Sequence, residues 1–259
     1  MMNELCGRTD ELAKRLIVAL DVSEYEQAIQ LVDQLQPLGL TFKVGMELFY
    51  SEGMRVVDAI QERGCFTFVD LKLHDIPTTV RKASQSLASQ GVGFFNVHCS
   101  GGQAMMEAAV EGARSGAQTE GRNVPLVIGV TVLTSTSPEV LRDELKVEQP
   151  LQDYVVHCAL QAQSAGLDGV VCSAQEAPLI RNACGDDFLL VSPGIRPHVA
   201  GQTRVDDQVR VLTPSQALQN GSDYLVIGRP ITQSAEPLEA AQAILHEMAL
   251  AVDACSAAQ

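Results

Sequence analysis

The residues most able to do chemistry lie close together in one segment, Asp70-Leu-Lys72-Leu-His-Asp75. Side chains alternate across a β-strand, so Asp70 and Lys72 are predicted to share one face, and Leu71 and Leu73 the other. Opposite charge nearby favours the charged form of an amine, so we expect Lys72 to remain a cation. A fixed cation can stabilise negative charge on a substrate and then donate a proton. The alternative is a solvated strand end with a local ion pair.

Two further charged residues occur in apolar runs nearer the N-terminus. Asp21 ends one such run, and Lys43 lies inside the next. A charge that faces a buried interior is costly unless it is paired. Lys43 and Lys72 are positive, and Asp70 and Asp75 are negative, so these four groups can neutralise one another. The alternative interpretation of Lys43 is a lysine on an edge strand.

Glycine and arginine recur together in two later segments, Val191-Ser-Pro-Gly-Ile-Arg-Pro197 and Ile227-Gly-Arg-Pro230. The glycines let the backbone approach an anion closely. Arg196 and Arg229 can add forked donors to phosphate oxygens. The pair of segments therefore indicates a phosphate site, and the alternative is two tight turns that carry surface arginines.

Neither the histidines nor the cysteines have a metal-binding spacing. The patterns H-x-x-x-H, H-E-x-x-H and C-x-x-C are absent from the sequence, so we expect no metal site. The seven cysteines are irregularly spaced and are expected to be free thiols in a reducing compartment. Residues 1–15 lack the apolar core of a signal peptide, and the longest near-apolar run, 124–133, is too short to span a bilayer. These features favour a cytoplasmic protein.

The overall charge is strongly negative. Asp and Glu number 32 against 18 Lys and Arg, which gives a net charge of −14. Such a surface argues against a nucleic-acid or anionic-membrane partner. Apolar residues make up 46% of the chain, which excludes a disordered protein. An anionic ligand would therefore need local positive contacts, such as those named above.

Short apolar runs alternate with amphipathic stretches along the whole chain. The predicted strands cover residues 16–22, 42–48, 66–73, 94–99, 126–133, 169–172, 188–191 and 224–227. The predicted helices cover residues 25–36, 54–63, 80–90, 104–114, 152–165, 176–183, 214–219 and 237–251. Eight such units favour an α/β fold, a (β/α)8 TIM barrel, over a doubly wound sheet, which more often has about five to seven. We expect a single domain over 1–259, with 1–14 as an N-terminal extension.

A barrel would place the charged residues where enzymes of that fold carry their sites. Active sites lie at the carboxyl ends of the strands, and phosphate often binds to the loops after strands seven and eight. Asp70 and Lys72 would then face the mouth of the barrel, with Arg196 and Arg229 beside them. The loops at 134–138 and 193–212 are long, as functional loops often are.

From Ala19-Leu-Asp21 to Ile227-Gly-Arg-Pro230 the chain resembles the orotidine 5′-phosphate decarboxylase family. The most specific shared segment is Asp70-Leu-Lys72-Leu-His-Asp75-Ile-Pro-x-Thr79. The resemblance implies a barrel enzyme without a cofactor that converts orotidine 5′-phosphate to UMP in pyrimidine biosynthesis. It also implies a homodimer with shared active sites.

The resemblance implies roles for the residues at the reacting end. Lys72 is expected to donate the proton, and Asp70 to lie near the substrate carboxylate. Asp21 and Lys43 are expected to hold the ribose hydroxyls, and Thr134 to contact the pyrimidine. Loss of CO₂ from C6 leaves a carbanion without π delocalisation, which a preorganised cation such as Lys72 can stabilise.

Other roles implied by the resemblance concern the phosphate and the subunit interface. The residues expected to hold the phosphate are Arg196, Gln208, Gly228 and Arg229. The residues expected to reach the neighbouring subunit's site are Asp75, Ile76 and Thr79. Gln202 is an alternative to Gln208, because the loop that holds both varies in length.

Two other functions are compatible with parts of this pattern. The first is a sugar-phosphate lyase of the same superfamily, which uses Mg²⁺ and has a glutamate where this chain has Lys43. A lysine at that position would repel the metal. The second is a non-catalytic sensor of a phosphate ligand, which would not need Lys72 between two aspartates. Barrels host many chemistries, so the fold alone does not decide between these functions.

Overall fold

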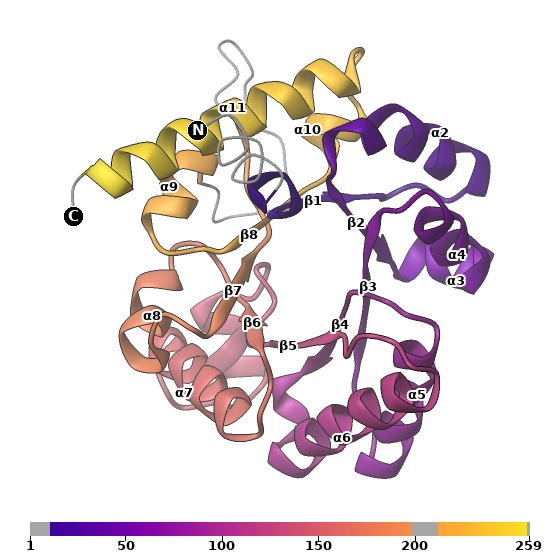
Figure 1. The fold of residues 1–259 in the computed structure, drawn as a ribbon. Helices are drawn as coiled ribbons and strands as arrows, with labels where there is room; N and C mark the ends of the chain where they lie inside the picture. The colour runs from indigo at the N-terminus through magenta and orange to yellow at the C-terminus, as the bar shows by residue number, and fades with distance from the viewer. Residues whose placement is uncertain (1–10, 198–211, 258–259) are drawn as a thin grey trace.

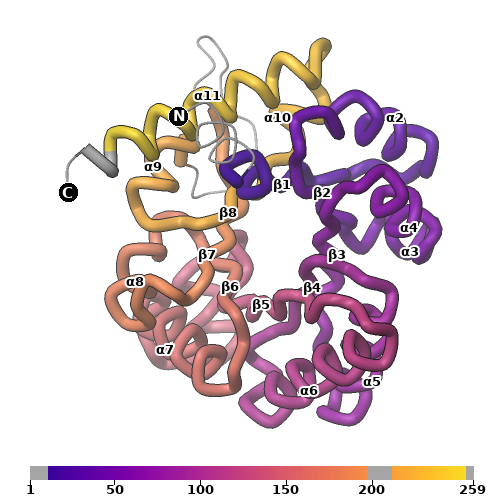
Figure 2. The backbone as a smooth tube through the Cα atoms, viewed as in Figure 1, coloured from indigo at the N-terminus to yellow at the C-terminus, as the bar shows by residue number. Residues whose placement is uncertain are grey.

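A computed structural model describes residues 11–197 and 212–257 of the chain. Its eight parallel strands close into a barrel in sequence order, and helices surround it (Figures 1 and 2). The strands are β1 Leu16–Ala19, β2 Thr41–Gly45, β3 Phe66–Leu73, β4 Phe94–His98, β5 Leu126–Val130, β6 Gly169–Val171, β7 Leu189–Ser192 and β8 Tyr224–Ile227. The predicted single-domain (β/α)8 barrel is therefore confirmed.

Helices fill the connections between consecutive strands and cover the outside of the barrel (Figure 1). They are α2 Tyr25–Leu35, α3 Met46–Glu52, α4 Met54–Glu62, α5 Pro77–Ser89, α6 Gln103–Thr119, α7 Leu151–Ser164, α8 Ala177–Cys184, α9 Pro214–Gln219, α10 Arg229–Thr232 and α11 Pro237–Ala257. The shorter turns are η1 Gln36–Leu38, η2 Cys99–Gly101 and η3 Val140–Glu144. Among the described helices, none is both long and apolar enough to cross a membrane.

The core has two apolar layers, one inside the barrel and one between the strands and the helices. Along β1, Ile17 and Ala19 belong to the cluster inside the barrel, while Leu16 and Val18 pack in the layer between strands and helices. Parallel strands covered on both sides have nearly continuous apolar sequences. This explains why the strands were recognisable as short apolar runs.

Several predicted boundaries are wrong by a few residues. The predicted strand 42–48 ends at Gly45, and the rest of that apolar run forms the start of α3. A short apolar run fits a strand or a helix equally well by periodicity, which explains the error. The predicted strand 126–133 also ends early, at Val130, and α10 was not predicted. Of the expected N-terminal extension, residues 1–10 lie outside the described residues, and residues 11–14 are helical.

Helices α5 and α6 pack unusually closely, and both follow strands that carry the candidate site. A Cβ atom on Gly112 would lie 2.1 Å from the carbonyl oxygen of Arg81, and one on Gly116 would lie 2.2 Å from that of Gln85. These two glycines therefore allow the backbone of α6 to touch α5. Since α5 follows β3 and α6 follows β4, this contact fixes the helices that support those strands.

Substituting Gly112→Ala should destabilise the fold by about 2 kcal/mol, because overpacking outweighs the helix propensity that alanine gains. Urea unfolding followed by circular dichroism measures this loss. The matched control is Gln118→Ala on the exposed face of the same helix, which should change stability by less than about 0.5 kcal/mol. Equal stability of the two variants would show that α6 can shift away from α5 without cost.

Candidate active site

A cavity of about 270 Å³ opens at the carboxyl ends of the strands. Its walls come from β1, β2, β3, β5, β6 and β8 and from the segments that follow β1, β5, β7 and β8. The predicted site residues that line it are Asp21, Lys43, Asp70, Lys72, Thr134, Arg196, Gly228 and Arg229. The structure thus brings together residues that are spread over most of the chain.

Four charged side chains alternate in sign across the cavity. The Lys72 ammonium donates to Oδ1 of Asp70 at 2.6 Å, and Nζ of Lys43 lies 3.2 Å from Oδ2 of the same carboxylate. Lys43 also donates to Oδ1 of Asp21, at 3.3 Å. The Lys43 and Asp70 side chains are only 11% and 13% exposed, whereas Asp21 is 55% exposed. The Asp70 carboxylate is therefore held between two cations in a largely buried place.

The mutual pairing shifts the pKa values of the two most buried groups. Burial alone would lower the pKa of Lys43, but the carboxylates of Asp70 and Asp21 outweigh it and raise that pKa above its ordinary value. Burial alone would raise the pKa of Asp70, but Lys43 and Lys72 hold it below its ordinary value. Both groups are therefore charged at neutral pH.

These two shifts define opposite pH limits for the stability of the network. The folded-state pKa of Asp70 is below its unfolded value, so its contribution is present above that unfolded value and is lost as pH falls through the folded pKa. The folded-state pKa of Lys43 is raised, so its contribution is present below the unfolded value and is lost as pH rises through the folded pKa. The network stabilises the fold between these limits.

The predicted participation of Asp75 in this network is not found within the chain. Asp75, Ile76 and Thr79 are exposed and do not line the cavity. The described partner of the Asp75 carboxylate is the backbone N–H of Ile76, at 2.6 Å. These residues follow Leu73, the last residue of β3, and lie in the connection to α5 and in its first turn. Within one chain, Asp21 is the second carboxylate of the network.

The part of the cavity formed by the loops after β7 and β8 is suited to an anion. Arg196, Gly228 and Arg229 line it together with Gly194, whose φ of +77° is the left-handed conformation that glycine adopts easily. A Cβ atom on Gly228 would lie 3.1 Å from Oδ2 of Asp21, so the glycine keeps this end of the cavity open. Gln208 and its alternative Gln202 lie outside the described residues.

One polar residue of the site was not predicted from the sequence. Asn96 lies in β4, is 1% exposed, and its Nδ2 donates to Oδ1 of Asp70 at 2.7 Å. Its Oδ1 accepts from the backbone N–H of Lys72 at 2.8 Å. The available signal was an asparagine within the apolar run Phe94-Phe-Asn-Val-His, since a buried amide needs partners.

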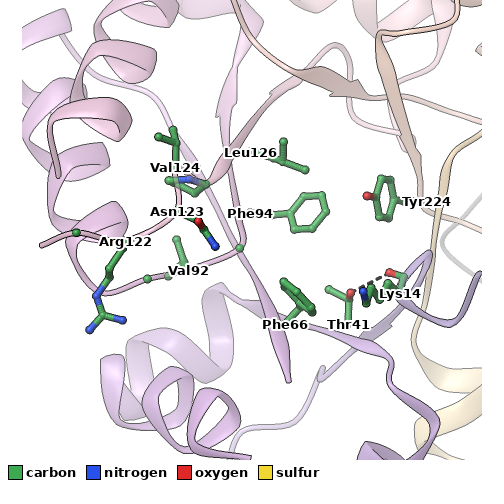
Figure 3. Close-up of a pocket in the computed structure, with 14 residues that line it drawn as sticks. Lys14, Thr41, Phe66, Val92, Phe94, Arg122, Asn123, Val124, Leu126 and Tyr224 are labelled. Atoms are coloured by element: carbon green, nitrogen blue, oxygen red, sulfur yellow. Dashed lines mark hydrogen bonds between the residues drawn. The ribbon is translucent and has the colours of Figure 1, made fainter. Parts of the chain in front are cut away.

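A larger cavity, of about 570 Å³, lies at the other end of the barrel (Figure 3). The rings of Phe66, Phe94 and Tyr224 stand around it, and these residues lie at the starts of their strands. Lys14 and Arg122 are its charged residues, and no carboxylate is among the described residues that line it. It lacks the paired charges that acid–base chemistry needs, so the smaller cavity is the candidate active site.

Comparison with known proteins shows the family of the chain. A family model described as "Orotidine 5′-phosphate decarboxylase / HUMPS family" matches residues 14–244. The chain belongs to this family. Residues from both ends of the matched region, Asp21 and Arg229, line the cavity at the mouth of the barrel.

The matches to relatives within the family extend over about nine tenths of the chain. It is 47% identical to orotidine 5′-phosphate decarboxylase from Bacillus cytotoxicus over 236 residues, which cover 91% of this chain and 98% of that protein. It is 48% identical to the enzyme of the same name from Moorella thermoacetica over 234 residues, which cover 90% and 92%. The crystal structure of orotidine 5′-phosphate decarboxylase from Lactobacillus acidophilus matches with a TM-score of 0.80 and 40% identity, covering 90% of this chain and 98% of that one.

Substituting Lys43→Met should raise the pKa of the Asp70 carboxyl, because one of its two cationic neighbours is removed. Titration of the Asp70 carboxyl carbon by ¹³C NMR measures this change. The matched control is Lys82→Met, which removes the same charge from an exposed position on α5 and should leave the titration unchanged. An unaltered Asp70 pKa in the Lys43 variant would contradict the electrostatic account of the site.

Proposed function

We propose that this chain, an enzyme of the orotidine 5′-phosphate decarboxylase / HUMPS family, decarboxylates orotidine 5′-phosphate to UMP in pyrimidine biosynthesis. The observation that carries the proposal is the cavity itself. It holds the alternating charges of Asp21, Lys43, Asp70 and Lys72 together with two arginines. The substrate has matching parts, a phosphate at one end and a carboxylated ring at the other.

In this proposal the substrate lies across the cavity. Its phosphate binds Arg196 and Arg229 beside Gly228, with Gln208 as a further phosphate ligand. The pyrimidine reaches Thr134 and Lys72, and the ribose hydroxyls lie near the paired Asp21 and Lys43. Binding energy from the remote phosphate can then be used to lower the barrier at the ring.

The proposed reaction needs one bond cleavage and one proton transfer. The bond between C6 and the carboxylate breaks, CO₂ leaves, and the electron pair stays on C6. The Lys72 ammonium stabilises this charge and then donates a proton to C6, and solvent returns a proton to the amine. Asp70 lies near the departing carboxylate in this orientation, and it holds Lys72 in place at 2.6 Å.

We propose that the reaction uses no metal or other cofactor. The Lys43 ammonium lies between the carboxylates of Asp21 and Asp70, 3.3 Å and 3.2 Å from them. A divalent cation would need those oxygens, and the positive charge of Lys43 would repel it. This geometry favours decarboxylation over the Mg²⁺-dependent sugar-phosphate chemistry that was the main alternative.

We also propose that two copies of the chain form a homodimer with shared active sites. Asp75, Ile76 and Thr79 would then complete the partner's site. The support is the exposure of two large apolar side chains that follow neighbouring strands. Ile76 is 66% exposed after β3, and Tyr50 is 74% exposed after the neighbouring strand β2. Large exposed apolar side chains near one another often mark protein–protein contacts.

The cell compartment and other partners are further parts of the proposal. A cytoplasmic location is supported by the free thiols of the described cysteines Cys65, Cys99, Cys158, Cys172 and Cys184. The net charge of −14 supports a protein that binds a small molecule and not nucleic acid.

Purified protein should convert orotidine 5′-phosphate to UMP at the same rate with and without EDTA, because no step uses a metal. Loss of substrate absorbance and chromatography of UMP measure the reaction. The variant Lys72→Ala should lose at least about 10³-fold in kcat, since the cation and the proton donor are both removed. The control Lys82→Ala should retain full activity. Strict Mg²⁺ dependence, or near-normal kcat in the Lys72 variant, would reject the proposed chemistry.

Inactive Lys72→Ala and inactive Asp75→Asn proteins should regain activity when they are mixed and allowed to exchange subunits. In a heterodimer with shared sites, one site carries both changes and the other carries neither. Equal amounts should therefore give about a quarter of all sites intact. Native mass spectrometry verifies the exchange. If Asp75 acts within its own chain, every site keeps one change and mixing restores nothing.

A further inference from the structure

Strands β3 and β4 do not pair regularly beside the site. Val69 pairs with Phe95 and Leu73 pairs with Val97, so three residues of β3 stand opposite Asn96 alone. These three residues are Asp70, Leu71 and Lys72. A bulge of this kind re-aims side chains and often occurs next to active sites.

Lys72 has an unusual backbone conformation within this bulge. Its φ is +53°, and the only other residue with a positive φ, among the described residues that are not glycine, is Lys146. A side chain with a Cβ atom disfavours this left-handed region by about 1–2 kcal/mol. Such conformations persist only where the surroundings hold them, and they cluster at functional sites.

Asn96 stabilises this conformation of Lys72 through hydrogen bonds at both ends of its side-chain amide. Its Oδ1 accepts from the backbone N–H of Lys72 at 2.8 Å, which replaces the ladder bond that the bulge removes. Its Nδ2 donates to Oδ1 of Asp70 at 2.7 Å, the same oxygen that receives the Lys72 ammonium at 2.6 Å. One buried amide therefore fixes both the backbone of Lys72 and the carboxylate that aims its side chain.

We propose that Asn96 is a positioning residue for the reaction, which sets the orientation of the Asp70–Lys72 pair without touching the substrate. This inference rests on the proposed function. Asn96 is 1% exposed and is not among the residues that line the cavity. It acts through Lys72, so its loss should slow the chemical step and leave substrate binding nearly unchanged.

The amide is the side chain best suited to this role. It presents one acceptor and one donor in a plane, which matches one N–H group and one carboxylate. An aspartate of the same shape would keep the acceptor for Lys72 but would place a second carboxylate against Asp70. An alanine would lose both contacts and leave the N–H of Lys72 without its partner.

The test compares Asn96→Ala and Asn96→Asp with a control that also loses a buried hydrogen bond. The control is Thr131→Val, because Oγ1 of the buried Thr131 donates to the carbonyl of Val171 at 3.0 Å and joins the end of β5 to β6, not β3 to β4. Steady-state kinetics with orotidine 5′-phosphate should show kcat about 10²-fold lower in both Asn96 variants, with KM within about threefold of the wild type. The control should keep kcat and KM even where its melting temperature falls.

A second readout does not depend on activity. In Asn96→Ala the Asp70 carboxyl should titrate at higher pH by ¹³C NMR, because a hydrogen bond to its charged form is lost. The control should leave that titration unchanged. If Asn96→Ala does not fold, the isosteric Asn96→Asp carries the kinetic test.

The outcomes separate this inference from the proposed function. If the wild type does not convert orotidine 5′-phosphate, the proposed function fails, and the Asp70 titration still decides whether Asn96 controls the pair. If the wild type is active and the Asn96 variants keep wild-type kcat, the positioning role is overturned. Loss of kcat to the same extent in Thr131→Val would also overturn it, because general destabilisation would then explain the effect.

Discussion

The rest of the site depends on one interaction, the pairing of the Asp70 carboxylate with the ammonium groups of Lys43 and Lys72. A carboxylate so little exposed is tolerated only with close partners, and here Lys43, Lys72 and Asn96 supply them. Removal of any one takes a partner from this buried carboxylate. The same pairing fixes the cation before a substrate arrives, so no reorganisation is needed when negative charge develops beside it.

The barrel makes this pairing possible by placing distant segments in register. Ala19 of β1 pairs with Lys43 of β2, and Gly45 of β2 pairs with Asp70 of β3. The charged residues of neighbouring strands therefore lie side by side at the carboxyl end of the barrel. Closure of the barrel then brings β8 against β1. A Cβ atom on Gly228 would lie 3.1 Å from Oδ2 of Asp21, so the anion-binding residues and the charged residues line one cavity.

The sequence alone predicts the features that depend on the local pattern of apolar and charged residues. The eight strands and the charges on β2 and β3 could be predicted because buried parallel strands are short apolar runs, in which any charged residue stands out.

The bulge at Lys72 could not be predicted, because strict alternation was assumed and a register shift depends on the neighbouring strand. Asn96 was missed for the same reason, since its importance appears only when β4 is placed beside β3. Asp75 follows the end of β3 and does not line the chain's own cavity, which the spacing of charges in the sequence could not show.

A crystal structure of the protein with UMP tests the central claim most directly, because the product contains both the phosphate and the carbon that receives the proton. The account predicts that the phosphate contacts Arg196 and Arg229, and that C6 of the uracil faces Nζ of Lys72 at about 3–3.5 Å, the separation of a near-attack geometry. A uracil ring turned so that C6 points away from Lys72, or UMP bound only in the cavity at the other end of the barrel, would contradict it.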